Sequence, residues 1–291
     1  GASPAEAGEF TKRAFLNGKM DLTQAEAVAS LISANGQESA KASFNLLQGS
    51  LSDKISNILD KIVSLSASMA AWVDYPDEEI PELDESTLKS TLTSALNELK
   101  NLLDNYESGM IMTQGVNTVI AGRPNAGKST LMNMLSGKEK SIVTHIEGTT
   151  RDIVENSVRL GTLVLHLSDT AGLRESDDVV EAIGIKKALE RIDTSSLVLA
   201  VFDSSRELDG DDKMLIDACK GKKAVAVINK TDLSPAIDTE EIENNFESSV
   251  YISAKNNTGL KELENAVKNI LGVEEFDSSA PLIANQRQKL C

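Results

Sequence analysis

The residues with the clearest chemical meaning lie near the middle of the chain. Residues 122–129 read Gly-Arg-Pro-Asn-Ala-Gly-Lys-Ser and fit the pattern GxxxxGK[ST]. They follow an apolar run at residues 116–121, which predicts a buried strand, and they open a helical pattern over residues 129–136. In that setting backbone N–H groups cradle phosphate oxygens, the lysine adds charge at the β- and γ-phosphates, and the serine hydroxyl can bind Mg²⁺. Glycine-rich turns without a ligand also exist, but the Lys-Ser pair favours a nucleoside triphosphate site formed by Asn125, Ala126, Gly127, Lys128, Ser129 and Thr130.

Two motifs further along the chain indicate which base is bound. Residues 229–232 read Asn-Lys-Thr-Asp, an NKxD pattern, and residues 253–255 read Ser-Ala-Lys; each follows a predicted strand. The Asp232 carboxylate can accept hydrogen bonds from the N1–H and the exocyclic amine of guanine, whereas adenine would leave that carboxylate unpaired. The base site is expected to consist of Asn229, Lys230, Asp232, Ser253, Ala254 and Lys255. Together with the phosphate-binding pattern, these motifs predict GTP or GDP as the ligand.

A fourth motif, Asp-Thr-Ala-Gly at residues 169–172, has the DxxG pattern of GTP-binding proteins. Asp169 can reach the Mg²⁺ shell, and the Gly172 N–H can bond the γ-phosphate. The next residue is Leu173, whereas Ras-type proteins use a glutamine in this loop to orient the attacking water. Hydrolysis therefore needs a water-positioning residue from elsewhere. Glu181 is a candidate, and an ordinary acidic residue near a helix N-terminus is the alternative interpretation.

The transition state of hydrolysis also needs a neutralising charge. Arg151 and Arg174 are candidates, and Arg123 lies in the phosphate-binding loop itself. Asn125 offers another route, because its amide oxygen can hold a monovalent cation against the phosphates. The sequence alone leaves these alternatives open.

The composition limits the class of protein. A length of 291 residues predicts two domains, and 41% hydrophobic residues with only 3% aromatics favour aliphatic, largely helical packing. No apolar run is long enough to span a bilayer. Cys219 and Cys291 give neither a disulfide framework nor a metal-binding spacing, so we expect a reducing cytoplasm and no membrane partner. The formal net charge of −16 would repel nucleic acid at long range, so any RNA must meet a local basic patch or be held by another protein.

The first part of the chain is predicted to be all helical. Helices are expected over residues 9–16, 24–34, 37–73 and 88–109. Thr23 and Glu26 predict a capping box for the second of these helices. Apolar residues from Phe44 to Trp72 repeat every three or four positions and predict the long third helix, whose Ser, Ala and Asn flanks favour an intramolecular bundle over a dimeric coiled coil. Residues 74–81, with two prolines and clustered acids, predict a solvated loop rather than a metal site.

The character of the sequence changes at Val116, where short β-rich runs begin to alternate with helical ones. Strands are expected over residues 116–121, 153–160, 162–168, 196–202, 223–228 and 250–252, and helices over residues 129–136, 180–192, 211–219, 240–246 and 260–271. This alternation predicts a doubly wound α/β domain with its ligand at the carboxyl ends of the strands. A helix that begins after Pro281 is expected to return to the helical part. We therefore expect an α/β P-loop GTPase domain at residues 113–275, inserted into an all-α helical bundle domain made of residues 1–112 and 276–291.

The motifs resemble a known group of proteins. Residues 148–152, Gly-Thr-Thr-Arg-Asp, together with the phosphate-binding loop look like the TrmE/Era/EngA group of translation-associated GTPases. Within that group, residues 8–19, 21–27 and 74–80 resemble the MnmE (TrmE) family of tRNA-modifying GTPases, and the likeness covers nearly the whole chain. The resemblance implies hydrolysis of GTP when two G domains meet with potassium bound. It also implies a flavoprotein partner of the MnmG (GidA) type, a carboxymethylaminomethyl-type modification of the tRNA wobble uridine, and tRNA presented by the complex.

The same resemblance assigns roles to individual residues. Potassium would be held by Asn125, by the carbonyls of Thr144 and Ile146, and by the loop that ends at Thr149, whereas Mg²⁺ would be held by Ser129, Thr150 and Asp169. Glu181 would orient the attacking water through a bridging water, and Lys128 and Gly172 would complete the catalytic set. These roles follow from position in the family pattern.

Two departures from the family pattern limit what the resemblance implies. The folate-binding domain that precedes this region in the family is not found ahead of Gly1, so folate is expected to bind only to the parent protein. The family's C-terminal cysteine motif is also missing, and Cys291 is assigned no role. Two alternative functions stay open, namely a ribosome-assembly GTPase of the Era or EngA kind and a nucleotide-gated scaffold with little turnover. The first would need a KH-like domain or a second G domain, and Leu173 in place of glutamine keeps the second open.

Overall fold

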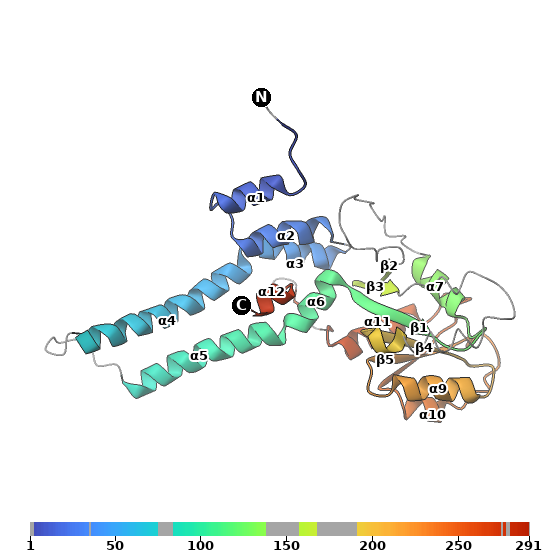
Figure 1. The fold of residues 1–291 in the computed structure, drawn as a ribbon. Helices are drawn as coiled ribbons and strands as arrows, with labels where there is room; N and C mark the ends of the chain where they lie inside the picture. Colours follow the sequence, from blue (N-terminus) through green and yellow to red (C-terminus); the bar gives the residue numbers. More distant parts are fainter. Residues whose placement is uncertain are drawn as a thin grey trace. The chain divides into compact units, whose positions relative to one another are not determined.

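The computed structural model describes residues 3–34, 36–74, 84–137, 157–167, 191–274, 276–277 and 280–290. The chain forms two compact units, one made of Gly1–Thr113 with Asp277–Cys291 and the other of Gln114–Phe276 (Figure 1). Predictions for the loop at residues 75–81, the start of a strand at residues 153–156 and the helix at residues 180–190 lie outside the described residues. Of the described helices, none combines the length and the apolar composition needed to cross a bilayer.

In its described residues the first unit contains helices and no strand. Its helices are α1 (Glu9–Leu16), α2 (Leu22–Ile32), α3 (Gln37–Leu47), α4 (Ser50–Asp74), α5 (Glu85–Asp104), α6 (Tyr106–Gln114) and α12 (Gln286–Leu290). Buried apolar residues from five segments form its core: Ala27, Leu46, Leu51, Ile58, Ala95, Leu102, Ile283 and Ala284. The long helices α4 and α5 lie side by side (Figure 1), and Glu98 on α5 pairs with Lys54 and Lys61 on α4 at 2.6 Å each. The long helices therefore pack within one chain, as the bundle interpretation predicts.

The prediction of one helix over residues 37–73 is wrong, because the chain forms two helices. α3 ends at Leu47 and α4 begins at Ser50. Between them Gly49 has a φ of 95°, in the left-handed region that glycine adopts without a Cβ clash. The apolar spacing runs on across this break, so the periodicity does not reveal it.

Two further helix boundaries differ from the predicted ones. The capping box of α2 is made by Asp21 and Gln24 and not by Thr23 and Glu26: Gln24 N donates to Asp21 Oδ1 at 2.8 Å, and Asp21 N donates to Gln24 Oε1 at 2.9 Å. The last predicted helix of this unit is also divided, because α5 ends with Asn105 as its C-cap and α6 follows. In the first case a polar residue two positions earlier captures the free N–H groups of the first turn.

The second unit is built on a six-stranded sheet in the order β2-β3-β1-β4-β5-β6. The strands are β1 (Val116–Ala121), β2 (Ser157–Leu160), β3 (Leu163–Leu167), β4 (Leu197–Asp203), β5 (Ala224–Asn229) and β6 (Ser248–Tyr251). β3, β1, β4, β5 and β6 pair in parallel, and β2 pairs antiparallel with β3. β4 and β5 are buried at every residue, as expected for central parallel strands covered on both faces.

Helices α7 (Lys128–Ser136), α9 (Gly210–Cys219), α10 (Thr239–Glu243) and α11 (Leu260–Leu271) accompany this sheet. Phe202 and Ile228 from the central strands pack with Leu215 and Ile216 of α9 in one buried cluster. Because the strands are parallel, the carboxyl ends of β1, β4, β5 and β6 meet at one edge of the sheet. The segments that follow Ala121, Asp203, Asn229 and Tyr251 are therefore brought together there.

Candidate nucleotide-binding site

The segment after β1 turns sharply at the carboxyl edge of the sheet before α7 begins. A Cβ at Gly122 would overlap the carbonyl oxygen of Val201 on β4, and a Cβ at Gly127 would overlap Nδ2 of Asn229. Gly127 has a φ of 96° and Asn125 a φ of 60°, a region where glycine and asparagine are favoured. Both flanking glycines are thus required by close approach of the backbone. The first N–H groups of α7 have no partner within the helix and suit an anion.

Lys128, the first residue of α7, reaches back over the loop. Its Nζ donates to the carbonyl oxygen of Arg123 at 2.6 Å. Burial lowers the pKa of Lys128 from 10.5 to about 8. A phosphate group placed beside this ammonium would favour its charged form. Lys128 is therefore positioned for an anionic ligand.

Asn229 at the end of β5 joins three segments that are far apart in the sequence. Its side chain is buried, with the residue only 2% exposed. Its Nδ2 donates to Ala126 O at 3.0 Å, and its Oδ1 accepts from Ala254 N at 3.0 Å. The structure thus brings the loop at residues 122–129, the NKxD segment and the Ser-Ala-Lys segment to one place.

The other residues of the NKxD segment are held by specific partners. Ser253 Oγ donates to Asp232 Oδ1 at 2.6 Å, and this hydrogen bond is the main cause that lowers the pKa of Asp232. Asp232 is therefore an ionised acceptor, as recognition of two donors on a base requires. Lys230 has a φ of 66°, and its Nζ donates to Asp203 Oδ2 at 2.6 Å.

Two anchoring residues of this site carry no motif and were not predicted. Asp203 ends β4, is 2% exposed, and also accepts from the N–H and hydroxyl of Ser205. Burial alone would raise the pKa of Asp203, but the hydrogen bonds from Lys230 and Ser205 lower it. Asp209 pairs with Arg123 at 2.6 Å. A carboxylate directly after a buried strand was the available signal for Asp203, whereas nothing local marks Asp209 as the partner of a residue far earlier in the chain.

The remaining predicted residues divide into two sets. Ser129, Thr130 and Lys255 are exposed beside the segments just described. Thr144, Ile146, Thr149, Thr150, Asp169, Gly172 and Glu181 lie outside the described residues, as do Arg151, Leu173 and Arg174. In the part of the chain that the structure describes, no three His, Cys, Asp or Glu side chains gather in a way that could hold a metal.

Arg123 is one of the candidates for the charge that neutralises the transition state of hydrolysis. Its side chain is 8% exposed and is paired with Asp209 and, at 3.3 Å, with Asp212. A guanidinium held by two carboxylates on α9 is not free to turn toward a phosphate. Arg123 therefore does not fit the role of a mobile charge that neutralises the transition state.

Comparison with known proteins gives the family. A family model described as the MnmE helical domain matches residues 22–291. The chain belongs to this family. The tRNA modification GTPase MnmE of Natranaerobius thermophilus is 43% identical over 273 residues, which are 93% of this chain and 60% of that protein. The MnmE of Clostridioides difficile (strain 630) is 40% identical over 290 residues, which are 98% of this chain and 63% of that protein.

The chain thus spans less than two thirds of the length of these curated relatives. Among solved structures, the G domain of the T. maritima FeoB iron transporter is similar to part of the chain, with 25% identity, a TM-score of 0.37, and coverage of 53% of this chain and 98% of that one. The fold class is the expected one, an α/β domain of the P-loop GTPase type whose sequence is inserted into that of an all-α MnmE helical domain.

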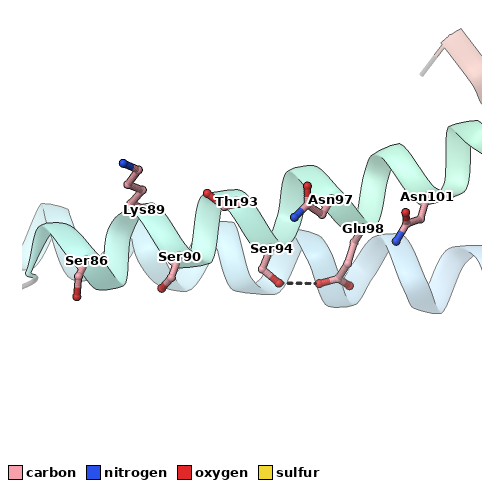
Figure 2. Close-up of a pocket in the computed structure, with 8 residues that line it drawn as sticks. All are labelled: Ser86, Lys89, Ser90, Thr93, Ser94, Asn97, Glu98 and Asn101. Atoms are coloured by element: carbon pink, nitrogen blue, oxygen red, sulfur yellow. Dashed lines mark hydrogen bonds between the residues drawn. The ribbon is translucent and has the colours of Figure 1, made fainter.

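A shallow polar groove runs along α5 in the helical unit (Figure 2). It is lined by hydroxyl and amide side chains with one lysine and one carboxylate: Ser86, Lys89, Ser90, Thr93, Ser94, Asn97, Glu98 and Asn101. Glu98 is already paired with Lys54 and Lys61 and also accepts from Ser94 at 3.1 Å. The hydrogen bonds from Lys54 and Lys61 lower the pKa of Glu98 to about 2, so this carboxylate is a poor base for the Ser94 hydroxyl, and we assign the groove no chemistry.

Proposed function

We propose that this chain binds GTP and GDP and hydrolyses GTP to GDP and phosphate. The observation that carries the proposal is the buried Asn229 side chain, which links Ala126 in the phosphate-binding loop to Ala254 in the Ser-Ala-Lys segment. Asp232 supports guanine as the base, because it is ionised and fixed by Ser253. The G domain in this proposal is the stretch 113–275, and residues 1–112 and 276–291 form the helical domain.

The site suits two cations in this proposal. The Ser129 hydroxyl lies at the start of α7 and is exposed, as a Mg²⁺ ligand needs to be. Thr150 and Asp169 would complete the Mg²⁺ set. Asn125 is exposed in the same loop and would hold potassium with Thr144, Ile146 and Thr149. Both cations, when bound, would supply positive charge to the phosphates.

Catalysis in this proposal requires residues from beyond the loop. Glu181 would orient the attacking water, the Gly172 N–H would bond the γ-phosphate, and Lys128 would supply charge. Because the Arg123 guanidinium is paired with Asp209 and Asp212, potassium held by Asn125 is the better source of neutralising charge. Face-to-face contact of two G domains would complete the site, so turnover would depend on protein concentration.

The relatives supply the biological setting of the proposal. Curated proteins at 40–43% identity are named as tRNA modification GTPases, and we propose that this chain acts in tRNA modification, in the cytoplasm. The process would be modification of the wobble uridine with a flavoprotein of the MnmG type. The charge of −16 fits a chain to which tRNA is presented by such a complex.

Turnover of GTP, measured in KCl and in NaCl over a range of protein concentrations, tests this function. We expect turnover per chain to rise with concentration in KCl and to stay low in NaCl. GDP should compete and ADP should not. Asn125→Ala should abolish the excess of the KCl rate while leaving GDP affinity within a few fold, since the Asn125 side chain is exposed and the phosphates would be held mainly by backbone N–H groups and Lys128.

Contrary results would be informative. Nucleotide binding without turnover in either salt would favour the scaffold alternative over the enzyme. An unchanged KCl excess in Asn125→Ala would place the cation elsewhere. Equal competition by ADP and GDP would contradict the assignment of the base site.

A further inference from the structure

A charged cluster lies behind the phosphate-binding loop, where the loop meets α9. Arg123 Nη1 donates to Asp209 Oδ2 at 2.6 Å and lies 3.3 Å from Asp212 Oδ2. The Arg123 and Asp212 side chains are 8% and 2% exposed, and that of Asp209 is 49% exposed. One guanidinium thus faces two carboxylates, one of them fully buried. Such a pair is expensive to break, because removing one partner leaves a buried charge.

The two carboxylates are themselves fixed by the first turn of α9. Asp209 is the N-cap, and its Oδ1 accepts from Asp211 N at 3.0 Å and from Asp212 N at 3.1 Å. Asp212 closes the capping box by accepting from Asp209 N at 3.3 Å. The Oδ1 atom of Asp212 is buried and has no partner, and burial raises the pKa of this residue although Arg123 opposes the shift. The acceptors for Arg123 therefore have a defined position relative to β4 and α9.

The main chain of Arg123 contacts other residues of the loop. Its carbonyl oxygen accepts from Lys128 Nζ at 2.6 Å and from Ala126 N at 3.3 Å. The same residue therefore anchors the loop to α9 through its side chain and fixes Lys128 through its backbone. A displacement of Arg123 would move the Lys128 contact directly, whereas the base site keeps its own contacts, from Ala254 N to Asn229 Oδ1 and from Ser253 Oγ to Asp232 Oδ1.

We propose that Arg123, held by Asp209 and Asp212, is a positioning residue that sets the shape of the phosphate-binding loop and the location of Lys128. The proposal rests on the proposed nucleotide binding. Arg123 acts through the loop and touches no phosphate. Loss of the cluster should therefore weaken binding of the β-phosphate selectively and leave recognition of guanine intact.

The test compares affinities for GDP and GMP in three variants. Arg123→Lys keeps the charge but loses the planar fork that reaches two carboxylates. Asp212→Asn removes the buried acceptor charge, and Asp211→Asn is the matched control because it removes the same charge from the same turn. We expect Arg123→Lys to lose about tenfold or more in GDP affinity, since small displacements of positioning groups have effects of that size. Asp212→Asn should lose less, and Asp211→Asn should match the wild type.

The pattern across ligands decides the outcome. GMP affinity should be unchanged in all variants. A fourth variant that combines Arg123→Lys with Asp212→Asn should lose no more GDP affinity than Arg123→Lys alone, because both changes act on one contact. Melting curves without nucleotide identify a temperature at which each variant is folded, and affinities are measured there. If Arg123→Lys does not fold, the comparison of Asp212→Asn with Asp211→Asn tests the proposal. Equal losses for GDP and GMP, or no loss of GDP affinity, would overturn the proposal. If the wild type binds neither nucleotide, the proposed function itself fails; if it binds both and the variants match it, only the role of Arg123 fails.

Discussion

Lys128 is the residue of the candidate site whose protonation state can be tested most directly. Its ammonium is hydrogen-bonded to the Arg123 carbonyl and buried enough to lower its pKa to about 8. A neutral carbonyl compensates a buried charge less well than a phosphate does. Binding of GDP should therefore raise the pKa of Lys128. At a pH above about 8, the pKa without nucleotide, Lys128 should take up a proton when GDP binds.

This coupling predicts a pH dependence of GDP affinity. Between about pH 7, where the terminal phosphate is already ionised, and pH 8 Lys128 is charged, so affinity should change little. Above pH 8 affinity should fall, approaching tenfold per pH unit, because only the protonated fraction binds the phosphate well. Displacement of a fluorescent GDP analogue at constant ionic strength measures it. GMP, which carries the same base without the β-phosphate, corrects for titration of guanine. Lys128→Arg should remove the pH step because a guanidinium stays charged. A flat profile for the wild type would contradict the coupling.

Sequence patterns located the local signals of the site but not its long-range contacts. The strand before residues 122–129 and the helix after them were predictable because apolar runs and glycine positions are local. The pairing of Arg123 with Asp209, and of Lys230 with Asp203, depends on which strands become neighbours in the sheet. Periodicity contains no such information. The roles given to seven residues between 144 and 181 stay predictions, since these residues lie outside the described ones: Thr144, Ile146, Thr149, Thr150, Asp169, Gly172 and Glu181.

At the scale of whole elements, the helical unit shows where periodicity fails. Phe44, Leu47 and Leu51 keep the three-to-four spacing across the end of α3 and the start of α4, so the pattern favours one helix. The chain nevertheless forms two helices, because Gly49 adopts a φ of 95°, which ends α3 and turns the chain into α4. A single glycine within an apolar repeat is ambiguous, since helices also tolerate one at a modest cost.

Gly49→Ala tests this break. If the turn is required, the added Cβ is strained at positive φ and meets Gln24 Nε2 at 3.3 Å, so stability should fall by about 1–2 kcal/mol. Urea unfolding followed by Trp72, the single tryptophan of the chain and a residue of α4, reports on this unit. Gly18→Ala in the same unit is the comparison, because Gly18 also has a positive φ, 65°, but a Cβ there meets nothing within 4 Å, so it should lose less stability. A gain of stability in Gly49→Ala would mean that one continuous helix forms in solution.

At the scale of the whole molecule, the chain enters the sheet-containing unit after Thr113 and returns to the helical unit at Asp277. The return segment is held by one carboxylate, Glu26 on α2. Its oxygens accept from Arg287 Nε at 2.6 Å, Asn285 Nδ2 at 2.8 Å and Gln288 Nε2 at 3.0 Å. The hydrogen bond from Arg287 is the largest cause that lowers the pKa of Glu26, with burial opposing it. Leu282, Ile283 and Ala284, which directly precede Asn285 in the return segment, are buried.

Glu26→Ala should therefore loosen the return segment without disturbing the nucleotide site. The charge-assisted hydrogen bonds it removes are worth about 1.5–3 kcal/mol each in isolation, and the buried residues 282–284 keep part of the attachment. Hydrogen exchange should become faster at the amides of Ala284, Gln288 and Lys289, whose acceptors lie within this segment. Exchange in α11 and β1 should not change, because those elements take their contacts from the sheet-containing unit.

Glu9→Ala is the matched control, since Glu9 lies in the same unit and its ion pair is local, with Arg13 four residues away. It should leave exchange at residues 284–289 unchanged. If Glu26→Ala leaves the hydrogen-exchange rates at residues 284–289 unchanged, the buried apolar residues alone hold the return segment. If instead exchange rises in β1 and α11 as well, the two units unfold as one, and the attachment at Glu26 stabilises the whole chain. GDP affinity measured on the same sample separates these outcomes, because only the second lets the loop at residues 122–129 lose its support from β4 and α9.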